Sequence, residues 1–122
     1  MSKILLIEDS TFERKAIINI LKKGGYSEFV EAEDAETGIE KYKSEKPALV
    51  LLDLRLPGMD GLECFAELKK IDKNVKVIVV TIVTRQESVD EATKLGAKAY
   101  IMKPVTALKI LPEVEKVIGK AK

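Results

Sequence analysis

The sequence lacks histidine and tryptophan and has a single cysteine, Cys64. Without histidine there is no imidazole ligand for zinc, no Ser-His or Cys-His nucleophile pair and no histidine general base. One cysteine excludes an intrachain disulfide and a cysteine metal cluster, and we expect Cys64 to fill space in the core. Any chemistry must therefore rely on carboxylates, lysine and hydroxyl groups.

Long apolar runs and an excess of charge are also missing. No apolar run reaches the roughly 18 residues of a membrane span, and Met1-Ser2-Lys3 leads into a short apolar segment too abruptly for a signal peptide. The 21 basic and 20 acidic side chains leave a net charge of +1, which gives no strong field toward nucleic acid or an anionic membrane. We therefore expect a cytoplasmic protein with no membrane partner and no direct nucleic-acid partner.

The length of 122 residues suits one domain, residues 1–122, and two periodicities alternate along it. Apolar runs predict strands at residues 3–8, 48–54 and 75–83, with weaker ones at 27–32 and 98–102. Helical periodicity predicts helices at residues 11–23, 35–44, 62–70, 86–95 and 107–118. Strand and helix alternate five times, which predicts an α/β fold with a doubly wound, five-stranded parallel sheet.

Two helices carry more detailed expectations. In the first, Phe12, Ala16, Ile20 and Leu21 share a face that we expect to be buried. In the last, Pro112 removes a backbone donor and must kink the helix or delay its regular start.

Polar residues stand where the predicted strands end, at the edge of a parallel sheet where ligands bind. They are Glu8, Asp9, Asp53, Thr81 and Lys103. Taken singly, three of them have simpler explanations, because Asp9 suits a helix cap, Thr81 a strand and Lys103 a solvated loop. Asp53 is different, because a carboxylate at the end of an apolar strand needs a partner. Taken together, three carboxylates repel one another unless a cation neutralises them, and oxygen ligands suit Mg²⁺. One carboxylate then remains as a nucleophile, with an ammonium group for phosphate.

The segments KILLIED, LVLLDLRLPGMDGLE, VIVVTIV and GAKAYIMKP cover almost the whole chain. They resemble the response-regulator receiver family of two-component signalling, the CheY-like proteins. The resemblance implies a flavodoxin-like strand order of 2-1-3-4-5 and a regulatory phosphoacceptor that catalyses its own phosphorylation and dephosphorylation, not an enzyme acting on other substrates. Asp53 would take a phosphoryl group from a phosphohistidine, and Mg²⁺ would be held by Glu8, Asp9, Asp53 and the backbone carbonyl of Arg55.

The resemblance also implies a switch. Lys103 would contact a phosphate oxygen, and Thr81 would move to the phosphoryl group so that Tyr100 turns inward. This would change the face formed by residues 86–118 for binding a downstream protein. The peptide bond between Lys103 and Pro104 matches one that is cis in the family. The implied partners are a sensor histidine kinase or a histidine phosphotransfer domain, and a downstream target.

Three residues depart from the family pattern. Ile82 stands where the family usually has Ala or Gly, and we expect its bulk to hinder access to Asp53. Val83 and Arg55 occupy positions that flank the attacking water in the family, and an apolar Val83 cannot orient that water. We therefore expect a long-lived phosphoaspartate.

Several alternatives stay open. The chain is either a stand-alone module or a receiver domain excised from a larger regulator with an effector domain. A receiver-like binding module that no longer accepts phosphate is a third possibility, chiefly because of Ile82. A flavin carrier would need a loop rich in Ser, Thr and Gly where EDSTFER stands, and an aspartyl-phosphate phosphatase would carry a DxD pattern there.

Overall fold

A five-stranded parallel sheet forms the centre of the computed structural model, which describes residues 2–121. Its strands are β1 (Lys3–Ile7), β2 (Glu28–Ala32), β3 (Leu49–Leu52), β4 (Val77–Thr81) and β5 (Ala99–Met102). They lie in the order β2-β1-β3-β4-β5, and each neighbouring pair is parallel. The predicted fold class and the implied strand order are confirmed.

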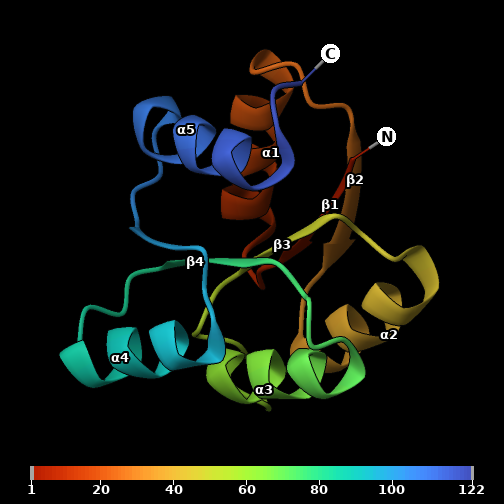
Figure 1. Ribbon diagram of the computed structural model, residues 1–122. Helices are drawn as coiled ribbons and strands as arrows, with labels where there is room; N and C mark the ends of the chain where they lie inside the picture. Colours follow the sequence, from red (N-terminus) through yellow and green to blue (C-terminus); the bar gives the residue numbers. More distant parts are fainter. Residues whose placement is uncertain (1, 122) are drawn as a thin grey trace.

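Five helices connect the strands and cover both faces of the sheet. They are α1 (Thr11–Lys23), α2 (Ala35–Glu45), α3 (Gly61–Ile71), α4 (Gln86–Leu95) and α5 (Ala107–Ile118). Figure 1 shows α1 and α5 on one face and α2, α3 and α4 on the other. The central strands β3 and β4 are therefore covered on both sides, which explains why their sequences LVLL and VIVVT are apolar almost throughout.

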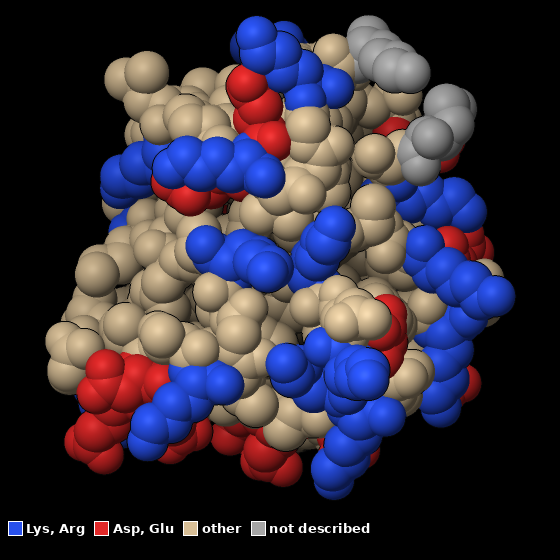
Figure 2. All heavy atoms as spheres, in the orientation of Figure 1, with Lys and Arg blue, Asp and Glu red and all other residues tan. Residues whose placement is uncertain are grey.

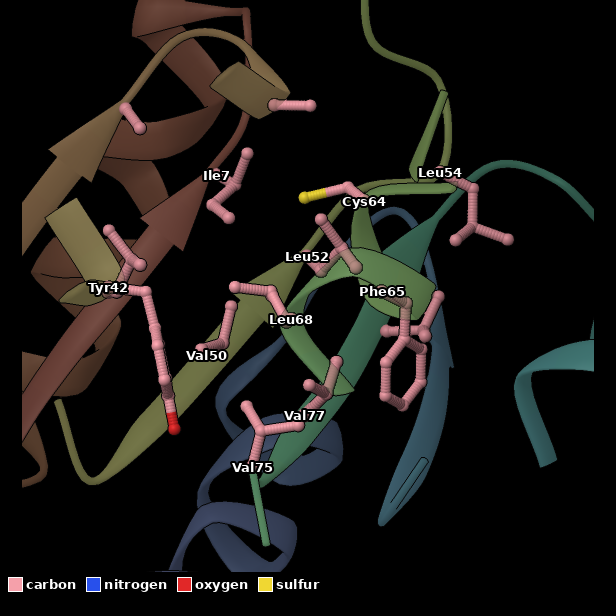
Figure 3. Packing of buried hydrophobic residues seen from close by; sticks show 14 of the residues in the cluster. Ile7, Tyr42, Val50, Leu52, Leu54, Cys64, Phe65, Leu68, Val75 and Val77 are labelled. Carbon is pink, nitrogen blue, oxygen red and sulfur yellow. The ribbon is translucent and has the colours of Figure 1, made fainter. Parts of the chain in front are cut away.

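Two apolar clusters fill the spaces between the sheet and its helices. The cluster under α2, α3 and α4 contains Phe65 and Leu68, both fully buried, and is shown in Figure 3. Full burial of a Phe or Leu side chain contributes roughly 1.5 to 3 kcal/mol. Cys64 is buried in the same cluster, as expected for a core residue, and burial together with nearby carboxylates raises the pKa of its thiol to about 12. The cluster under α1 and α5 includes Leu21 and Ile110.

The expectation for the buried face of α1 is wrong in part. Phe12 is 84% exposed and Ala16 is also exposed, whereas Ile17, Leu21 and the charged Arg14 are buried. The buried positions have ordinary helical spacing, but the charged Arg14 interrupts their apolar pattern. The apolar pattern of the sequence therefore predicted that the neighbouring face, with Phe12 and Ala16, is buried.

Helix α5 runs through Pro112 without the late start that we considered. It begins at Ala107, where the Thr106 side chain caps it by accepting a hydrogen bond from the Lys109 amide at 3.3 Å. The proline removes the amide partner of the Leu108 carbonyl, and Leu108 is 90% exposed. Water can therefore replace the missing hydrogen bond.

Charge is mixed on the surface. On the face drawn in Figure 2, basic side chains are scattered over the molecule, and acidic ones lie among them and also along the lower edge around α3 and α4. This distribution agrees with the small net charge of +1.

Candidate functional site

Backbone hydrogen bonds extend the strand ladders into the residues that follow them. The Glu8 amide donates to Ala32 O at 3.0 Å, the Asp53 amide to Ile7 O at 3.0 Å, and the Lys103 amide to Thr81 O at 2.9 Å. These bonds fix the backbone of the residues after β1, β3 and β5 at one edge of the sheet. The structure thus brings together the side chains that the sequence pattern placed there.

A glycine keeps the segment after β3 close to α3. A Cβ atom on Gly61 would lie 2.4 Å from Asp53 O and 2.4 Å from the Leu54 Cα, closer than real Cβ contacts allow. The Gly61 amide also donates to Leu54 O at 2.9 Å. Helix α3 can therefore begin against the backbone beside Asp53 only because no side chain stands at Gly61.

The three carboxylates form one cluster. Ligand oxygens of Glu8, Asp9 and Asp53 all lie within 4.8 Å of one another. Glu8 and Asp53 are buried and Asp9 is exposed, so the cluster opens to solvent on one side. It lines a hollow of about 660 Å³ together with Arg55 and Lys103. A set of oxygen ligands with this excess of negative charge is chemically suited to Mg²⁺.

Lys103 supplies the positive charge at this site. Its Nζ donates to Glu8 Oε1 at 2.5 Å and to Asp53 Oδ2 at 2.8 Å, and it forms an ion pair with Glu13 Oε1 at 2.6 Å. Burial alone lowers the pKa of Lys103, but the hydrogen bonds to Asp53, Glu13 and Glu8 outweigh it, so the net shift is upward. Lys103 therefore carries its charge throughout the physiological pH range.

Burial and hydrogen bonds act in opposite directions on the pKa of Glu8. Burial raises the pKa of its carboxyl group to about 7, although the hydrogen bonds from Lys103 and the Ser10 amide act in the opposite direction. The Ser10 amide donates to Glu8 Oε2 at 2.9 Å. Both carboxylate oxygens of Glu8 thus have donors, which holds the side chain in place.

Asp53 accepts hydrogen bonds on both oxygens. The buried Thr81 hydroxyl donates to Asp53 Oδ1 at 2.8 Å, and the Arg55 amide donates to the same atom at 3.0 Å. The Lys103 bond occupies Oδ2. These donors fix the orientation of the carboxylate.

A chain of hydrogen bonds leads from Asp53 to strand β5. The Val83 amide donates to Thr81 Oγ1 at 3.3 Å, and the Tyr100 hydroxyl donates to Val83 O at 2.6 Å. Tyr100 is partly buried, and burial raises the pKa of its hydroxyl, with a further contribution from the Asp53 charge. The two predicted switch residues are thus connected through one intervening residue.

The remaining predicted residues lie around the entrance. Ile82 is 53% exposed and lines both the acidic hollow and a neighbouring apolar groove of about 360 Å³. Val83 packs partly buried against the core, and Arg55 is exposed. The peptide bond between Lys103 and Pro104 is cis.

Two functional candidates were missed from the sequence. Glu13 contacts Lys103, and the buried Arg14 donates to the Glu8 carbonyl oxygen at 2.6 Å. Both stand in the first turns of α1, where acidic and basic residues ordinarily face solvent. For Glu13, the sequence signal was the motif Ser10-Thr11-Phe12-Glu13, which has the spacing of a capping box and marks Glu13 as a residue with a structural partner.

Comparison with known sequences identifies the family. The family model described as the response regulator receiver domain matches residues 4–115. The chain belongs to this family. It is a receiver domain of the CheY type, and such domains are regulatory and typically bind Mg²⁺.

Individual relatives agree with the receiver assignment. The chain is 36% identical to the chemotaxis protein CheY of Bacillus subtilis, covering 96% of this chain and 98% of that protein. It is 34% identical to the sporulation initiation phosphotransferase F of the same organism, covering 93% and 91%. Proteins named for two different processes, chemotaxis and sporulation, are therefore similar to this chain at nearly the same level of identity.

Solved receiver structures have the same fold. The CheY chain in a CheX-CheY-BeF3-Mg complex from Borrelia burgdorferi superposes with a TM-score of 0.90 at 31% identity, covering 95% of this chain and 88% of that chain. A CheY-like receiver from Methanospirillum hungatei gives a TM-score of 0.88 at 33% identity, covering 95% and 92%. Among residues 2–121, none of the helices has the length and apolar character needed to cross a bilayer.

Proposed function

We propose that this receiver accepts a phosphoryl group on Asp53 from a phosphohistidine of a sensor histidine kinase or a histidine phosphotransfer domain. The observation that carries the proposal is the set of donors around the Asp53 carboxylate. Lys103, the Thr81 hydroxyl and the Arg55 amide hold this buried group at the wall of the acidic hollow. The absence of histidine means that the donor imidazole must come from another protein or domain.

The transfer is a displacement at phosphorus. An Asp53 carboxylate oxygen forms a bond to phosphorus, the phosphorus–nitrogen bond of the phosphohistidine breaks, and the imidazole leaves with the electron pair and takes up a proton. Phosphoryl transfer requires mainly alignment of the nucleophile and neutralisation of the moving oxygens. The donors around Asp53 supply the alignment, and the Lys103 ammonium supplies fixed positive charge.

The acidic cluster fits the metal that the family implies. Glu8, Asp9, Asp53 and the backbone carbonyl of Arg55 are the groups that would hold Mg²⁺. When bound, the ion would neutralise charge on the carboxylates and on the phosphoryl oxygens. Glu8, anchored by Lys103 and the Ser10 amide, orients the cluster for this purpose.

The effect of phosphorylation passes from Asp53 to the surface through the hydrogen bonds that connect Asp53 to Tyr100. A phosphoryl group on Asp53 offers new acceptor oxygens to the Thr81 hydroxyl, which is bonded to the Val83 amide, and Val83 in turn accepts from Tyr100. A shift of Thr81 therefore alters the segment that holds Tyr100 and changes the face formed by α4, β5 and α5. A downstream protein would bind this face, whether residues 1–122 act as one independent domain or as part of a larger regulator.

The test is phosphorylation followed by measurement of the intact mass. The protein is incubated with Mg²⁺ and either acetyl phosphate or a phosphorylated histidine kinase, beside Asp53→Asn. We expect one added phosphoryl group on the wild type, none on Asp53→Asn, and loss of the reaction when a chelator removes the metal. An unmodified wild type with both donors contradicts the proposal and favours a binding module that does not accept phosphate.

A further inference from the structure

Three carboxylates surround the Lys103 ammonium group. An ammonium group has three N–H donors. Glu8 Oε1 lies 2.5 Å from Nζ, Glu13 Oε1 lies 2.6 Å away and Asp53 Oδ2 lies 2.8 Å away. A phosphoryl oxygen can therefore contact Lys103 only if one of these three acceptors gives up its place.

Glu13 is the acceptor that can leave most easily. The Glu8 and Asp53 side chains are only 5% and 6% exposed, and each has further hydrogen-bond donors. The Glu13 side chain is 46% exposed, so water can solvate its carboxylate as soon as it swings away. Its separation from Lys103 leaves no unpaired carboxylate in the buried part of the site and thus costs the least free energy of the three.

The start of α1 frees Glu13 from its usual structural role. In a capping box, the Glu three residues after the cap accepts a hydrogen bond from the amide of the cap residue. Here the Ser10 amide donates to Glu8 Oε2 instead, at 2.9 Å. The other half of the box remains, because the Glu13 amide donates to Ser10 Oγ at 3.2 Å. The Glu13 carboxylate is consequently not needed for the cap and turns to Lys103.

Glu13 also stands at the entrance to the site. Together with Ile82 and Lys103 it lines both the acidic hollow and the neighbouring apolar groove. A phosphodonor that reaches Asp53 through this opening brings negative phosphoryl oxygens close to the Glu13 carboxylate. The two negative charges repel each other, and they compete for the same ammonium group.

We propose that Glu13 is a displaceable counter-ion of Lys103 that restrains phosphorylation of the receiver. Glu13 holds Lys103 until a phosphoryl group takes its place, and it disfavours small anionic phosphodonors that bring no binding energy of their own. It is a positioning residue, because it acts through Lys103. The inference rests on the proposed function of Asp53.

The test compares the rates of phosphorylation of Glu13→Gln, the wild type and Glu40→Gln. Glu40 is exposed on α2 and pairs only loosely with Lys43, at 3.5 Å, so its replacement makes the same change in net charge away from the site. Acetyl phosphate is the donor. An Asp53 oxygen bonds to phosphorus, the bond from phosphorus to the acetate oxygen breaks, and acetate leaves with the electron pair without transfer of a proton.

We expect Glu13→Gln to react roughly two- to fivefold faster than the wild type, the range set by a partly exposed ion pair. Its affinity for beryllium fluoride, a mimic of the phosphoryl group, should rise by a similar factor. Glu40→Gln should behave as the wild type. The advantage of Glu13→Gln should shrink as salt is added, because screening weakens the charge on Glu13, whereas a merely structural effect would not depend on salt in this way.

The outcomes separate a failure of the Glu13 inference from a failure of the proposed function of Asp53. Equal or slower reaction of Glu13→Gln beside a phosphorylated wild type overturns the inference and leaves the role of Asp53 intact. The same acceleration in Glu40→Gln also overturns it, because net charge alone would then explain the effect. A wild type that takes no phosphoryl group overturns the proposed function and this inference together.

Discussion

The Arg14 guanidinium donates a hydrogen bond to the backbone carbonyl of Glu8 at 2.6 Å. The Arg14 side chain is only 7% exposed, and its Nε also donates to Glu31 Oε1 at 2.7 Å. A buried charge thus connects the end of β2 to the turn that carries Glu8 and Asp9. This turn supplies two of the three carboxylates of the site, so Arg14 supports the site without lining the acidic hollow.

Replacement of Arg14 should destabilise the fold. Arg14→Met leaves the Glu8 carbonyl and Glu31 without their shared donor, and we expect a loss of about 2 to 3 kcal/mol in the free energy of unfolding. Urea unfolding measures this value. Lys15→Met is the matched control, because Lys15 pairs with the same Glu31 at 2.8 Å but is 57% exposed. Its loss should cost less than about 1 kcal/mol, and equal losses in the two variants would contradict the role of Arg14.

The ion pairs of Glu31 predict that the stability of the fold depends on pH in the acid range. The hydrogen bond from Lys15, aided by Arg14, lowers the pKa of Glu31 below its usual 4.5 despite partial burial. The folded state therefore binds fewer protons than the unfolded chain just below pH 4.5, and stability falls as the pH drops through the folded pKa. Glu31→Gln should be less stable than the wild type by about 1 to 3 kcal/mol at neutral pH. This difference should shrink in acid, and a gap that stays constant down to the acid transition would contradict it.

The Thr81 hydroxyl should couple phosphorylation to Tyr100. Thr81→Val keeps the shape of the side chain but removes the donor to Asp53, so Asp53 should still be phosphorylated while Tyr100 no longer responds. NMR of labelled tyrosine rings follows the response in the presence of beryllium fluoride. Thr84→Val, at an exposed position in the same segment, should respond like the wild type. If the NMR signal of Tyr100 in Thr81→Val shifts as far as in the wild type, Thr81 does not couple phosphorylation to Tyr100.

Most of the fold was predictable because the strands are apolar on both sides. The expected strand at residues 75–83 is observed as Val77–Thr81, and the boundaries of the other expected elements differ from the observed ones by two residues or fewer. The carboxylates were predictable because parallel strands end at one edge. Glu13 and Arg14 were not, since their partners Lys103 and Glu31 lie far away in the sequence and a charged residue on a helix ordinarily faces solvent.

The bulk of Ile82 should slow access to Asp53. Its side chain is 53% exposed at the entrance that Glu13 and Lys103 share. Ile82→Ala removes that bulk without creating a core cavity, so the rate of phosphorylation by acetyl phosphate should rise while stability changes little. Ile71→Ala is a suitable control, because Ile71 is also partly exposed, at 42%, but lies at the end of α3. An unchanged rate in Ile82→Ala would show that Ile82 does not limit access.

The phosphoaspartate should decay slowly because Val83 offers no polar side-chain atom to an attacking water. Its amide and carbonyl groups are already bonded to Thr81 and Tyr100, so the backbone does not supply the missing contact. Val83→Asn adds a side chain that can hold a water molecule, and its phosphorylated form should decay faster. Loss of the phosphoryl group is followed by intact mass after removal of the donor, with Thr84→Asn as the control. Decay of the wild type within seconds would contradict the prediction, because the water would then be activated without any group at Val83.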